Sequence, residues 1–331
     1  MQLKLPELGV NFIGDPHFGK KFPYVPLHRK GEREEAQLNE FIKQLNEPCE
    51  VCIMVGDLFD TYIVPNEVIL DVYDAIRSAA IVAPERHFIM MEGNHDIARN
   101  SETVTSFDIL VKMLDDMDNV YFYQKIDPFY LDDGSAFLIC PYAPFSTAEE
   151  EVSKFKDQKF KLAVGHWDTD EVAGPHNLAP LELLSTMTDT IVTGHVHTAE
   201  TKKVFGANFY RTGSLLPYSH SEDPDETLYV TRTIEQVAIE MAENPDCYKD
   251  KCLRLLLTDS EDVPENIDSL QLTVKRLNKF KDDEPLEVEM GVFNFQELFN
   301  QSFKENDVPD NLRDEYWEYY QQKAATDVSE S

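Results

Sequence analysis

Short apolar runs that end in glycine or proline constrain the fold of this sequence more than any other feature. They recur up to about residue 215 as VNFIG, VCIMVG, HFIMMEG, FLICPY, KLAVGH and TIVTGH. Runs of this length without polar alternation are typical of strands buried on both faces. We therefore expect an α/β domain in which mixed sheets are flanked by helices.

Amphipathic helical patterns separate several of these runs. They cover residues 32–46, 66–80 and 106–117, and each repeats apolar residues at helical spacing. In the first pattern, the buried face is expected to consist of Ala36, Phe41, Ile42 and Leu45. Helices that alternate with buried strands support the layered architecture.

The pattern changes after Tyr218, where a polar loop precedes a second group of strands. Residues 227–231, 252–259 and 270–277 are predicted strands, so we expect a small appended α+β module. The expected organisation is a main domain at 1–220, the module at 221–280, an acidic linker at 281–291, a helical segment at 292–323 and a flexible tail at 324–331.

The helical segment at residues 292–323 repeats aromatic residues at helical spacing. Two short amphipathic helices are predicted there, after the acidic linker. Their apolar faces must either pack back on the main domain or bind a partner. The pattern leaves both alternatives open.

The charge balance opposes a nucleic-acid partner at first sight. The chain has 30 basic and 62 acidic residues, for a net charge of −32, whereas phosphate binding is mainly electrostatic. The stretch GKKFPYVPLHRKGER is locally basic, however, with Lys20, Lys21, Arg29 and Lys30. A basic loop on an acidic protein therefore keeps a DNA partner open.

Cysteine usage and hydropathy indicate the cellular compartment. Five cysteines are an odd number, which argues against a disulfide framework. A zinc site from Cys49, Cys52, Cys247 and Cys252 is an alternative, but Cys52 lies in a predicted buried strand, so reduced core cysteines are favoured. Neither a membrane span nor a secretory signal is predicted, and we expect a cytoplasmic protein without membrane attachment.

Metal-binding residue types follow the predicted strands one after another. A single Gly-Asp or histidine at such a place is usually a turn or a hydrogen-bonded structural residue. Here carboxylates, an amide and imidazoles come at successive strand ends, where ligands gather in α/β sheets. The candidates are Asp15, His17, Asp57, Asp60, Asn94, His95, Asp96, His166, His195 and His197.

The donor atoms predict the kind of centre. Carboxylate oxygen with imidazole nitrogen suits Mn²⁺, Fe²⁺ or Zn²⁺, and the absence of cysteine disfavours a closed structural zinc site. So many ligands exceed the needs of one ion. Two ions bridged by a carboxylate can activate a water molecule and hold a phosphate ester.

The segment TGHVH contributes two histidines to this set. Side chains two residues apart on an extended segment point to the same side. His195 and His197 are therefore expected to face one site, with Val196 turned away into packing.

The ordered motifs DPH, GDLFD, GNHD, GHW and GHVH resemble the calcineurin-like metallophosphoesterase superfamily over residues of about 10 to 215. GDLFD without a following Arg-Gly, together with GNHD and YRTGS, resembles the SbcD-like nuclease subunits of DNA double-strand-break repair complexes. GHW and the aromatic C-terminal helices are most similar to the recombination endonuclease subunits of tailed bacteriophages. The resemblance implies a metallophosphoesterase sandwich with a small capping module and C-terminal helices.

The resemblance also implies a role for each site residue. Asp57 would bridge two divalent ions, most often Mn²⁺, with Mg²⁺ or Fe²⁺ as alternatives. One ion would be held by Asp15, His17, Asp57 and His197, and the other by Asp57, Asn94, His166 and His195. His95 would protonate the leaving oxygen or stabilise the transition state, Asp96 would orient its ring, and Asp60 would support the ligands. For Asp60 and Asp96, simple turn capping stays open.

The implied activity is hydrolysis of DNA phosphodiesters, as an exonuclease on duplex ends and an endonuclease on single strands, in recombination, repair and replication. DNA contacts would come from Lys20, Lys21, Arg29, Lys30, Lys275 and Arg276. A homodimer would bind an SMC-like ATPase in a heterotetramer, through Phe295, Leu298, Phe299, Phe303, Tyr316 and Tyr320. The alternatives are a phosphatase or cyclic-nucleotide phosphodiesterase of the same superfamily, or a non-catalytic scaffold on the same fold.

Overall fold

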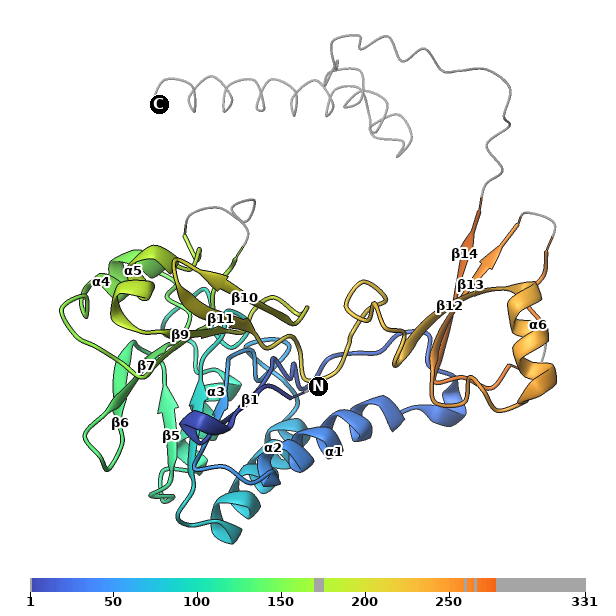
Figure 1. Ribbon diagram of the computed structural model, residues 1–331. Helices are drawn as coiled ribbons and strands as arrows, with labels where there is room; N and C mark the ends of the chain where they lie inside the picture. The colour runs from blue at the N-terminus through green and yellow to red at the C-terminus, as the bar shows by residue number, and fades with distance from the viewer. Residues whose placement is uncertain (1, 170–175, 259–260, 265–266, 278–331) are drawn as a thin grey trace, which may run out of the picture. The chain divides into compact units, whose positions relative to one another are not determined.

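The computed structural model describes residues 2–169, 176–258, 261–264 and 267–277 (Figure 1). The predicted linker at 281–291, the helical segment at 292–323 and all six expected partner contacts lie outside these residues. No helix in the described ranges is long and apolar enough to span a bilayer.

The first sheet has the strand order β1-β2-β3-β4-β5. Its strands are β1 (Lys4–Leu5), β2 (Val10–Ile13), β3 (Val51–Met54), β4 (His87–Met91) and β5 (Val120–Tyr123). All neighbours are parallel except β1 and β2. The carboxyl ends of β2, β3 and β4 therefore open at the same edge.

The second sheet has the order β10-β11-β9-β8-β7-β6. Its strands are β6 (Asp127–Tyr130), β7 (Ala136–Cys140), β8 (Leu162–Gly165), β9 (Thr190–Thr193), β10 (Glu200–Val204) and β11 (Ala207–Arg211). The predicted runs at β7, β8 and β9 form its parallel centre. The half-exposed strands β5, β6, β10 and β11 were not predicted. β6, β10 and β11 contain polar residues, and β5 (VYFY) is not followed by glycine or proline.

Apolar layers hold the two sheets and their helices together. Between the sheets, a core formed by residues such as Phe12, Ile53 and Val164 is fully buried. A second core lies under α1 (Glu32–Asn46), α2 (Asn66–Val82) and α3 (Ser106–Met113), and a third lies under α4 (Ala148–Ser153) and α5 (Leu181–Met187). The order helix, sheet, sheet, helix confirms the predicted sandwich.

The buried face of α1 differs from the prediction. Ala36 is exposed and Ile42 is 37% exposed, whereas Phe41 and Leu45 are buried as expected. The rest of the buried face is polar and consists of Arg33, Gln37 and Gln44. Gln37 donates to carbonyls of the loop after β2, Arg33 donates to the appended module, and Gln44 donates to Glu40 within the helix, so each buried polar side chain has a partner.

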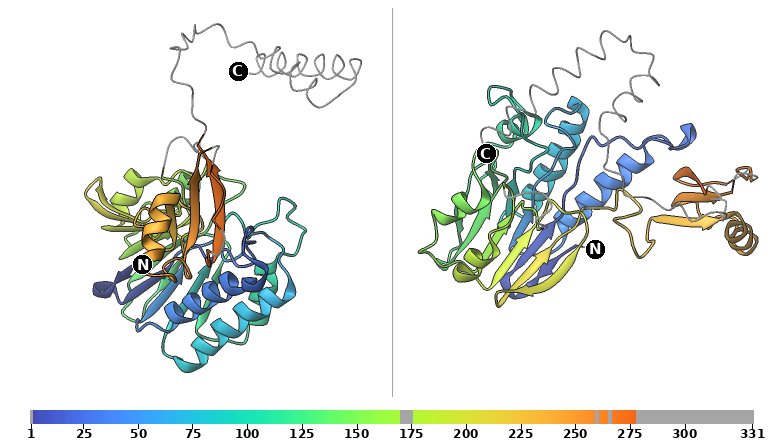
Figure 2. Two further views of the ribbon diagram at one scale, coloured as in Figure 1. Left: turned by 90° about the vertical axis from the view of Figure 1, so that its right-hand side faces the viewer. Right: turned by 90° about the horizontal axis from the view of Figure 1, so that it is seen from above.

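The appended module forms a third sheet of parallel strands, β12 (Tyr229–Thr233), β13 (Cys252–Leu257) and β14 (Gln271–Arg276). Helix α6 (Ile234–Glu243) covers one face of β12 and β13 (Figure 2). The module has its own apolar core around Leu253, Leu255 and Leu257. Even so, residues 1–278 form one compact unit.

Two arginines of the main domain connect it to the module. The guanidinium of Arg33, only 2% exposed, donates to Cys252 Sγ (2.8 Å), Gln271 Oε1 (3.1 Å) and Tyr229 Oη (3.1 Å). Arg29 donates to the Lys249 carbonyl and to Asp268 Oδ1 (3.2 Å). These buried hydrogen bonds hold the module against the main domain, because breaking them would leave a charged guanidinium group without partners.

Arg33→Ala should lower the free energy of unfolding by about 3 kcal/mol, because buried partners on β12 and β14 lose their donor. Denaturant titration of the full chain measures this change. Arg77→Ala is the control, since Arg77 pairs with the exposed Asp116 and should cost less than about 1 kcal/mol. Equal losses in both variants would contradict the anchoring role of Arg33.

Candidate metal centre

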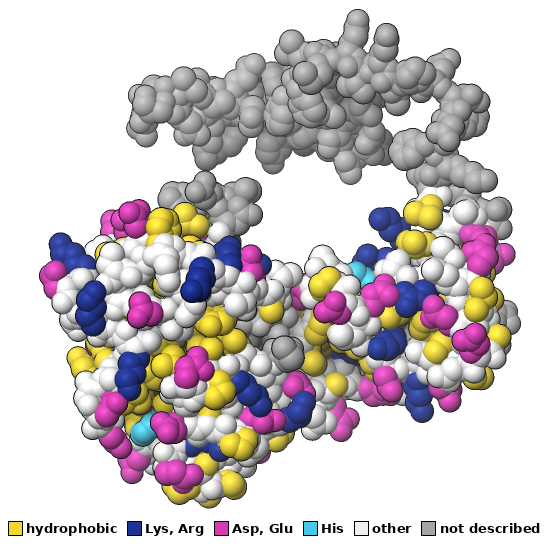
Figure 3. Space-filling view, viewed as in Figure 1, with side chains coloured by type: hydrophobic (Ala, Val, Ile, Leu, Met, Phe, Trp, Pro, Cys, Tyr) yellow, Lys and Arg dark blue, Asp and Glu magenta, His cyan; other side chains and the backbone are white. Residues whose placement is uncertain are grey.

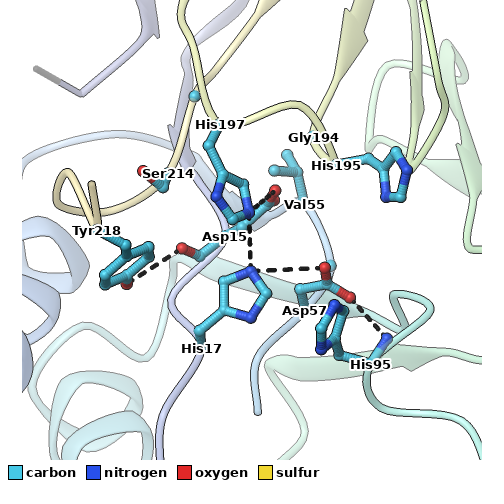
Figure 4. Close-up of polar contacts among 12 residues, drawn as sticks. Asp15, His17, Val55, Asp57, His95, Gly194, His195, His197, Ser214 and Tyr218 are labelled. Carbon is cyan, nitrogen blue, oxygen red and sulfur yellow. Dashed lines mark hydrogen bonds and ion pairs between the residues drawn. The ribbon is translucent and has the colours of Figure 1, made fainter. Parts of the chain in front are cut away.

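The predicted ligands meet at the carboxyl ends of strands from both sheets. Asp15 and His17 follow β2, Asp57 follows β3, and Asn94 follows β4. From the second sheet, His166 follows β8, and His195 and His197 follow β9. Figure 4 shows the side chains of Asp15, His17, Asp57 and His197 turned toward one another.

The first group consists of Asp15, His17 and His197. The Nε2 atoms of His17 and His197 lie 2.9 Å apart, and His197 Nε2 lies 3.8 Å from Asp15 Oδ2. Asp15 is completely buried, and neither of its carboxylate oxygens has a hydrogen-bond partner among the described residues. A buried carboxylate without a donor is costly. A cation between these atoms would remove that cost.

The second group consists of Asp57, His166 and His195, with Asn94 between the two imidazoles. The Asn94 Oδ1 atom lies 3.0 Å from His166 Nε2 and 2.8 Å from His195 Nδ1. His166 Nε2 also lies 3.3 Å from Asp57 Oδ1. Oxygen and nitrogen donors thus converge on one point, as a divalent ion requires.

Asp57 lies between the two groups. Its Oδ2 faces His17 Nε2 at 3.6 Å, while its Oδ1 faces His166 Nε2 and accepts a hydrogen bond from the His95 amide at 2.9 Å. One carboxylate therefore presents one oxygen to each group. This is the placement expected of a bridging ligand, and the described donors fit two divalent cations.

The backbone of the ligand loops is strained. His17, Asp57 and His195 have positive φ angles of 52°, 48° and 72°. Non-glycine residues adopt such angles only where the surrounding structure imposes them, and they concentrate at functional sites. These strained backbone angles lower the stability of the fold, and they direct the three side chains toward the candidate metal centre.

The turn at His195 corrects the expectation of an extended GHVH segment. β9 ends at Thr193, and the Val196 amide donates to the Gly194 carbonyl at 2.9 Å across His195. A γ-turn, and not strand alternation, therefore separates the two histidine side chains. His195 consequently joins the group around Asn94, whereas His197 joins the group around Asp15.

Two glycines are required by close packing. A Cβ atom at Gly93 would lie 2.2 Å from the Asp57 amide nitrogen, and one at Gly194 would lie 2.5 Å from Asp15 Oδ1. Any side chain at these positions would displace a ligand. The Gly-Asn and Gly-His pairs therefore bring the ligand loops within reach of one another.

The metal-free site has strongly perturbed ionisation. Burial raises the pKa of the Asp15 carboxyl to about 7. Burial alone would also raise the pKa of Asp57, but the nearby His166 and His17 hold it well below its usual range. Burial acts to lower the pKa of His166, yet the charge of Asp57 raises it to about 9. Protons occupy this site when no metal does.

Outer partners fix the imidazole rings. His166 Nδ1 lies 2.8 Å from the Val55 carbonyl, His195 Nε2 lies 3.0 Å from Asp168 Oδ1, and His197 Nδ1 lies 3.4 Å from Glu222 Oε1. Such partners set the tautomer and the basicity of ligand histidines. Asp168 was missed although it follows His166 by two residues in GHWD, and Glu222 lies in a polar loop without any motif.

Asp60 and Tyr218 support the loop that carries Asp15 and His17. Asp60 Oδ1 lies 3.5 Å from His17 Nδ1 and accepts from Lys20 Nζ at 3.1 Å. Tyr218, which was not predicted, donates from Oη to the Pro16 carbonyl. Asp60 therefore contacts the candidate ligand His17, and its supporting role stays a prediction.

His95 lies beside the ligands, whereas Asp96 is placed differently from the expectation. The His95 ring is exposed, its Nδ1 lies 2.7 Å from the Asp60 carbonyl, and its centroid lies 4.8 Å from that of His17. Asp96 does not contact the His95 ring. Its buried carboxylate accepts hydrogen bonds from three amides, those of Leu58, Phe59 and Gly93. It therefore ties the loops after β3 and β4 together.

Residues 9–199, more than half of the chain, match the family described as Calcineurin-like phosphoesterase. The chain belongs to this family. Calcineurin-like phosphoesterases are hydrolases, and the two groups of candidate ligands agree with a dimetal centre. No curated protein matches the sequence.

Two solved structures are similar to this phosphoesterase. A dimetal phosphatase from Danio rerio has 12% identity and a TM-score of 0.41, with 62% of this chain and 87% of that chain covered. GAP50, the anchor in the inner membrane complex of Plasmodium, has 16% identity and a TM-score of 0.37, with 62% and 71% covered.

Substitution of each histidine in the GHVH segment should affect a different ion. In His197→Ala the group around Asp15 should lose its ion, and in His195→Ala the group around Asn94 should lose its ion. Each loss should exceed the roughly 10- to 100-fold weakening typical of outer partners. Metal content after dialysis should fall from about two ions to about one in either variant.

His28→Gln is the control for this measurement, because His28 is exposed and belongs to neither group. It should retain both ions. Loss of both ions in His195→Ala and in His197→Ala alike would contradict the division of the site.

Metal binding should strengthen as the pH rises from about 6 to 8. The raised pKa of Asp15, about 7, means that the folded metal-free protein binds this proton more tightly than the unfolded chain does. Protonated Asp15 therefore stabilises the folded metal-free protein. This contribution is complete below the pKa that Asp15 has in the unfolded chain, and it is lost as the pH rises through about 7. Metal needs the carboxylate, so its apparent affinity should rise up to about tenfold per pH unit for each proton released.

The increase in Tm caused by a fixed Mn²⁺ concentration measures this dependence. It should be larger at pH 8 than at pH 6. An equal increase at both pH values would show that no proton leaves the ligands when metal binds.

Proposed function

We propose that this calcineurin-like phosphoesterase is a dimetal-dependent DNA nuclease, acting as an exonuclease on duplex ends and an endonuclease on single strands. The observation that carries the proposal is His95, a histidine outside the two proposed ligand groups, which lies at an open groove beside them. The groove has a volume of about 640 Å³ and also contains Asn94, Tyr62 and Arg99. An open groove suits a long strand better than an enclosed pocket for a small ester.

The residues of the site would share the work of phosphodiester hydrolysis. Asp15, His17, Asp57 and His197 would hold one ion, and Asp57, Asn94, His166 and His195 the other. When bound, the ions would supply a water molecule of lowered pKa and positive charge for the phosphate oxygens. We propose Mn²⁺ as the activating ion, with Mg²⁺ or Fe²⁺ as alternatives.

His95 would act on the leaving oxygen. Because the Asp60 carbonyl can only accept, the His95 Nδ1 atom carries a hydrogen, and Nε2 is the atom free to exchange a proton. The carbonyl also fixes the orientation of the ring. A protonated His95 could therefore donate from Nε2 to the 3′ oxygen as the bond to phosphorus breaks.

The basic residues predicted to bind DNA differ in how exposed their side chains are. Arg29 is buried, and its guanidinium is used by Glu32, Asp268 and the Lys249 carbonyl, so the prediction of a DNA contact is wrong for this residue. Lys20 is bonded to Asp60. The remaining predicted contacts are exposed, and they are Lys21, Lys30, Lys275 and Arg276.

A hollow on the module adds a further basic surface. It has a volume of about 750 Å³ and is lined by Tyr24, Arg254, Thr273 and Lys275 among others. Acidic and basic side chains are interspersed on the face drawn in Figure 3. With a net charge of −32, the chain would bind DNA weakly alone, so a basic partner would strengthen binding.

We propose that this partner is an SMC-like ATPase that binds residues 292–323, where helices are predicted from the sequence alone. We also propose that the nuclease acts as a homodimer within a heterotetramer in the cytoplasm. The support is the aromatic helical spacing of that segment together with the charge deficit of the chain. The proposed role is in DNA recombination, repair and replication.

His95→Gln should reduce cleavage of linear duplex DNA in the presence of Mn²⁺ by about 100-fold or more, because proton transfer contributes roughly 10²–10⁴ to such reactions. His95 lies with His17 and Asp60 in a third group of possible ligands. Because we propose that it acts on the leaving oxygen and not as a ligand, metal content should stay at the wild-type value. Gel analysis of DNA fragments and metal analysis of the same preparation provide the two readouts.

His28→Gln is again the matched control and should cut DNA at the wild-type rate. Undiminished cleavage by His95→Gln would contradict the role of His95. Hydrolysis of small phosphate esters without any cleavage of DNA would contradict the proposed nuclease and favour a phosphatase or a small phosphodiesterase.

A further inference from the structure

A second cavity lies next to the candidate metal centre and is not used by the mechanism above. It has a volume of about 500 Å³, which is within the usual range for small-ligand sites. Its lining comes from the segments after β4, β5, β7 and β8, and includes Glu92, Gln124, Tyr142 and Trp167. Two of these strands, β4 and β8, are also followed by candidate metal ligands, Asn94 and His166.

The cavity and the groove that holds His95 share one lining residue. Ile97 lines both, and it directly follows Asp96, whose three amide contacts fix the loop. On the other side, Trp167 directly follows the ligand His166. A molecule with a phosphate beside His95 could therefore place its next group in the cavity.

The walls of the cavity are flat and apolar. Tyr142 and Phe145 line it together with Pro141, Pro144 and the buried Trp167. Phe145 is 80% exposed, so its ring is open to a ligand. Aromatic faces of this kind stack on nucleobases without regard to sequence.

The carboxylate of Glu92 in the lining can form a hydrogen bond with a ligand. Glu92 is only 6% exposed, and its Oε1 accepts from Gln124 Nε2 at 3.0 Å. Gln124 Nε2 also donates to Asp108 Oδ1. These two bonds use both hydrogens of the Gln124 side-chain amide. Within the described ranges, Glu92 Oε2 makes no hydrogen bond and can accept one from a ligand. Two lysines in the lining are donors, but Lys154 is paired with Glu151, which leaves Lys125.

Acceptors favour a ligand that carries N–H donors. Cytosine, adenine and guanine present exocyclic amino groups, and a carboxylate is a common acceptor for the cytosine amine. Thymine presents two carbonyl oxygens on either side of a single N–H, and these would face the Glu92 carboxylate. In its ionised form, Glu92 would therefore pair with an amino base and repel thymine.

We propose that this cavity binds one unpaired nucleobase of the DNA strand, adjacent to the phosphodiester at the metal centre, and prefers a base with an amino group. The inference rests on the proposed nuclease function and adds a substrate preference to it. The exposed Lys125, which also lines the cavity, would face the neighbouring phosphate. Because the base must leave its stack, single strands and frayed ends are the preferred substrates.

The test uses the full chain with Mn²⁺ and two single-stranded oligonucleotides. One is a thymidine strand with a single central cytidine, and the other is a cytidine strand with a single central thymidine. Mapping of cut positions on a gel should show cleavage beside the lone cytidine enriched about five- to tenfold, and cleavage beside the lone thymidine depleted to the same degree. An abasic site in place of the cytidine should abolish the enrichment.

Glu92→Gln tests the polar group. In this variant the new side-chain carbonyl would accept from Gln124, so the new amide hydrogens would face the cavity and favour the thymine carbonyls. The preference should therefore vanish or move to thymidine. Phe145→Ala should weaken the enrichment through loss of stacking, while Glu149→Gln, an exposed glutamate on α4 outside the lining, should leave it unchanged.

The preference is measured by comparing cleavage at different positions of one strand by the same enzyme. Partial unfolding of a variant would lower cleavage at all positions equally and would leave the preference unchanged. Even cleavage of both strands by the wild type would overturn the base cavity but leave the nuclease proposal standing. A preference that persists in Glu92→Gln would overturn the assignment to this cavity. No cleavage of either strand, under conditions in which bis(p-nitrophenyl) phosphate is hydrolysed, would overturn both proposals.

Discussion

The carboxylate of Asp57 is the interaction on which the rest of the site depends. It is almost completely buried and presents one oxygen to His17 and the other to His166. A charge in such a place is tolerated only with cationic or hydrogen-bonding neighbours. The ligand loops of both sheets are therefore drawn to one point, and the positive φ angle of Asp57 is part of the cost of that arrangement.

The sandwich makes this arrangement possible. Apolar strands such as β3 and β8 bury their side chains between the sheets, and their carboxyl ends then open side by side. The family match covers this part of the chain, and the appended module lies beyond it. Arg33 connects the main domain to the module through neutral hydrogen-bond acceptors. The module thus supplies the partners of a buried charged group of the main domain.

Much of the candidate site could be predicted because its residues directly follow strands that are evident in the sequence. Asp15, Asp57 and His166 are examples. The outer partners could not be predicted in the same way. Glu222 reaches His197 from a loop with no motif, and Asp96 contacts backbone amides and not the neighbouring ring. Such contacts depend on loop paths, which periodicity does not describe.

The sequence by itself determined the layered α/β class and the set of ligand types, because strand periodicity and the residues after each strand are local properties. The resemblance also implied how the ligands divide, but only the tertiary structure shows how the chain achieves that division. The γ-turn at His195 places His195 and His197 in different groups, and Arg33 of α1 and Arg29, just before α1, anchor the module. These outcomes depend on contacts between segments far apart in the chain, which no local pattern contains.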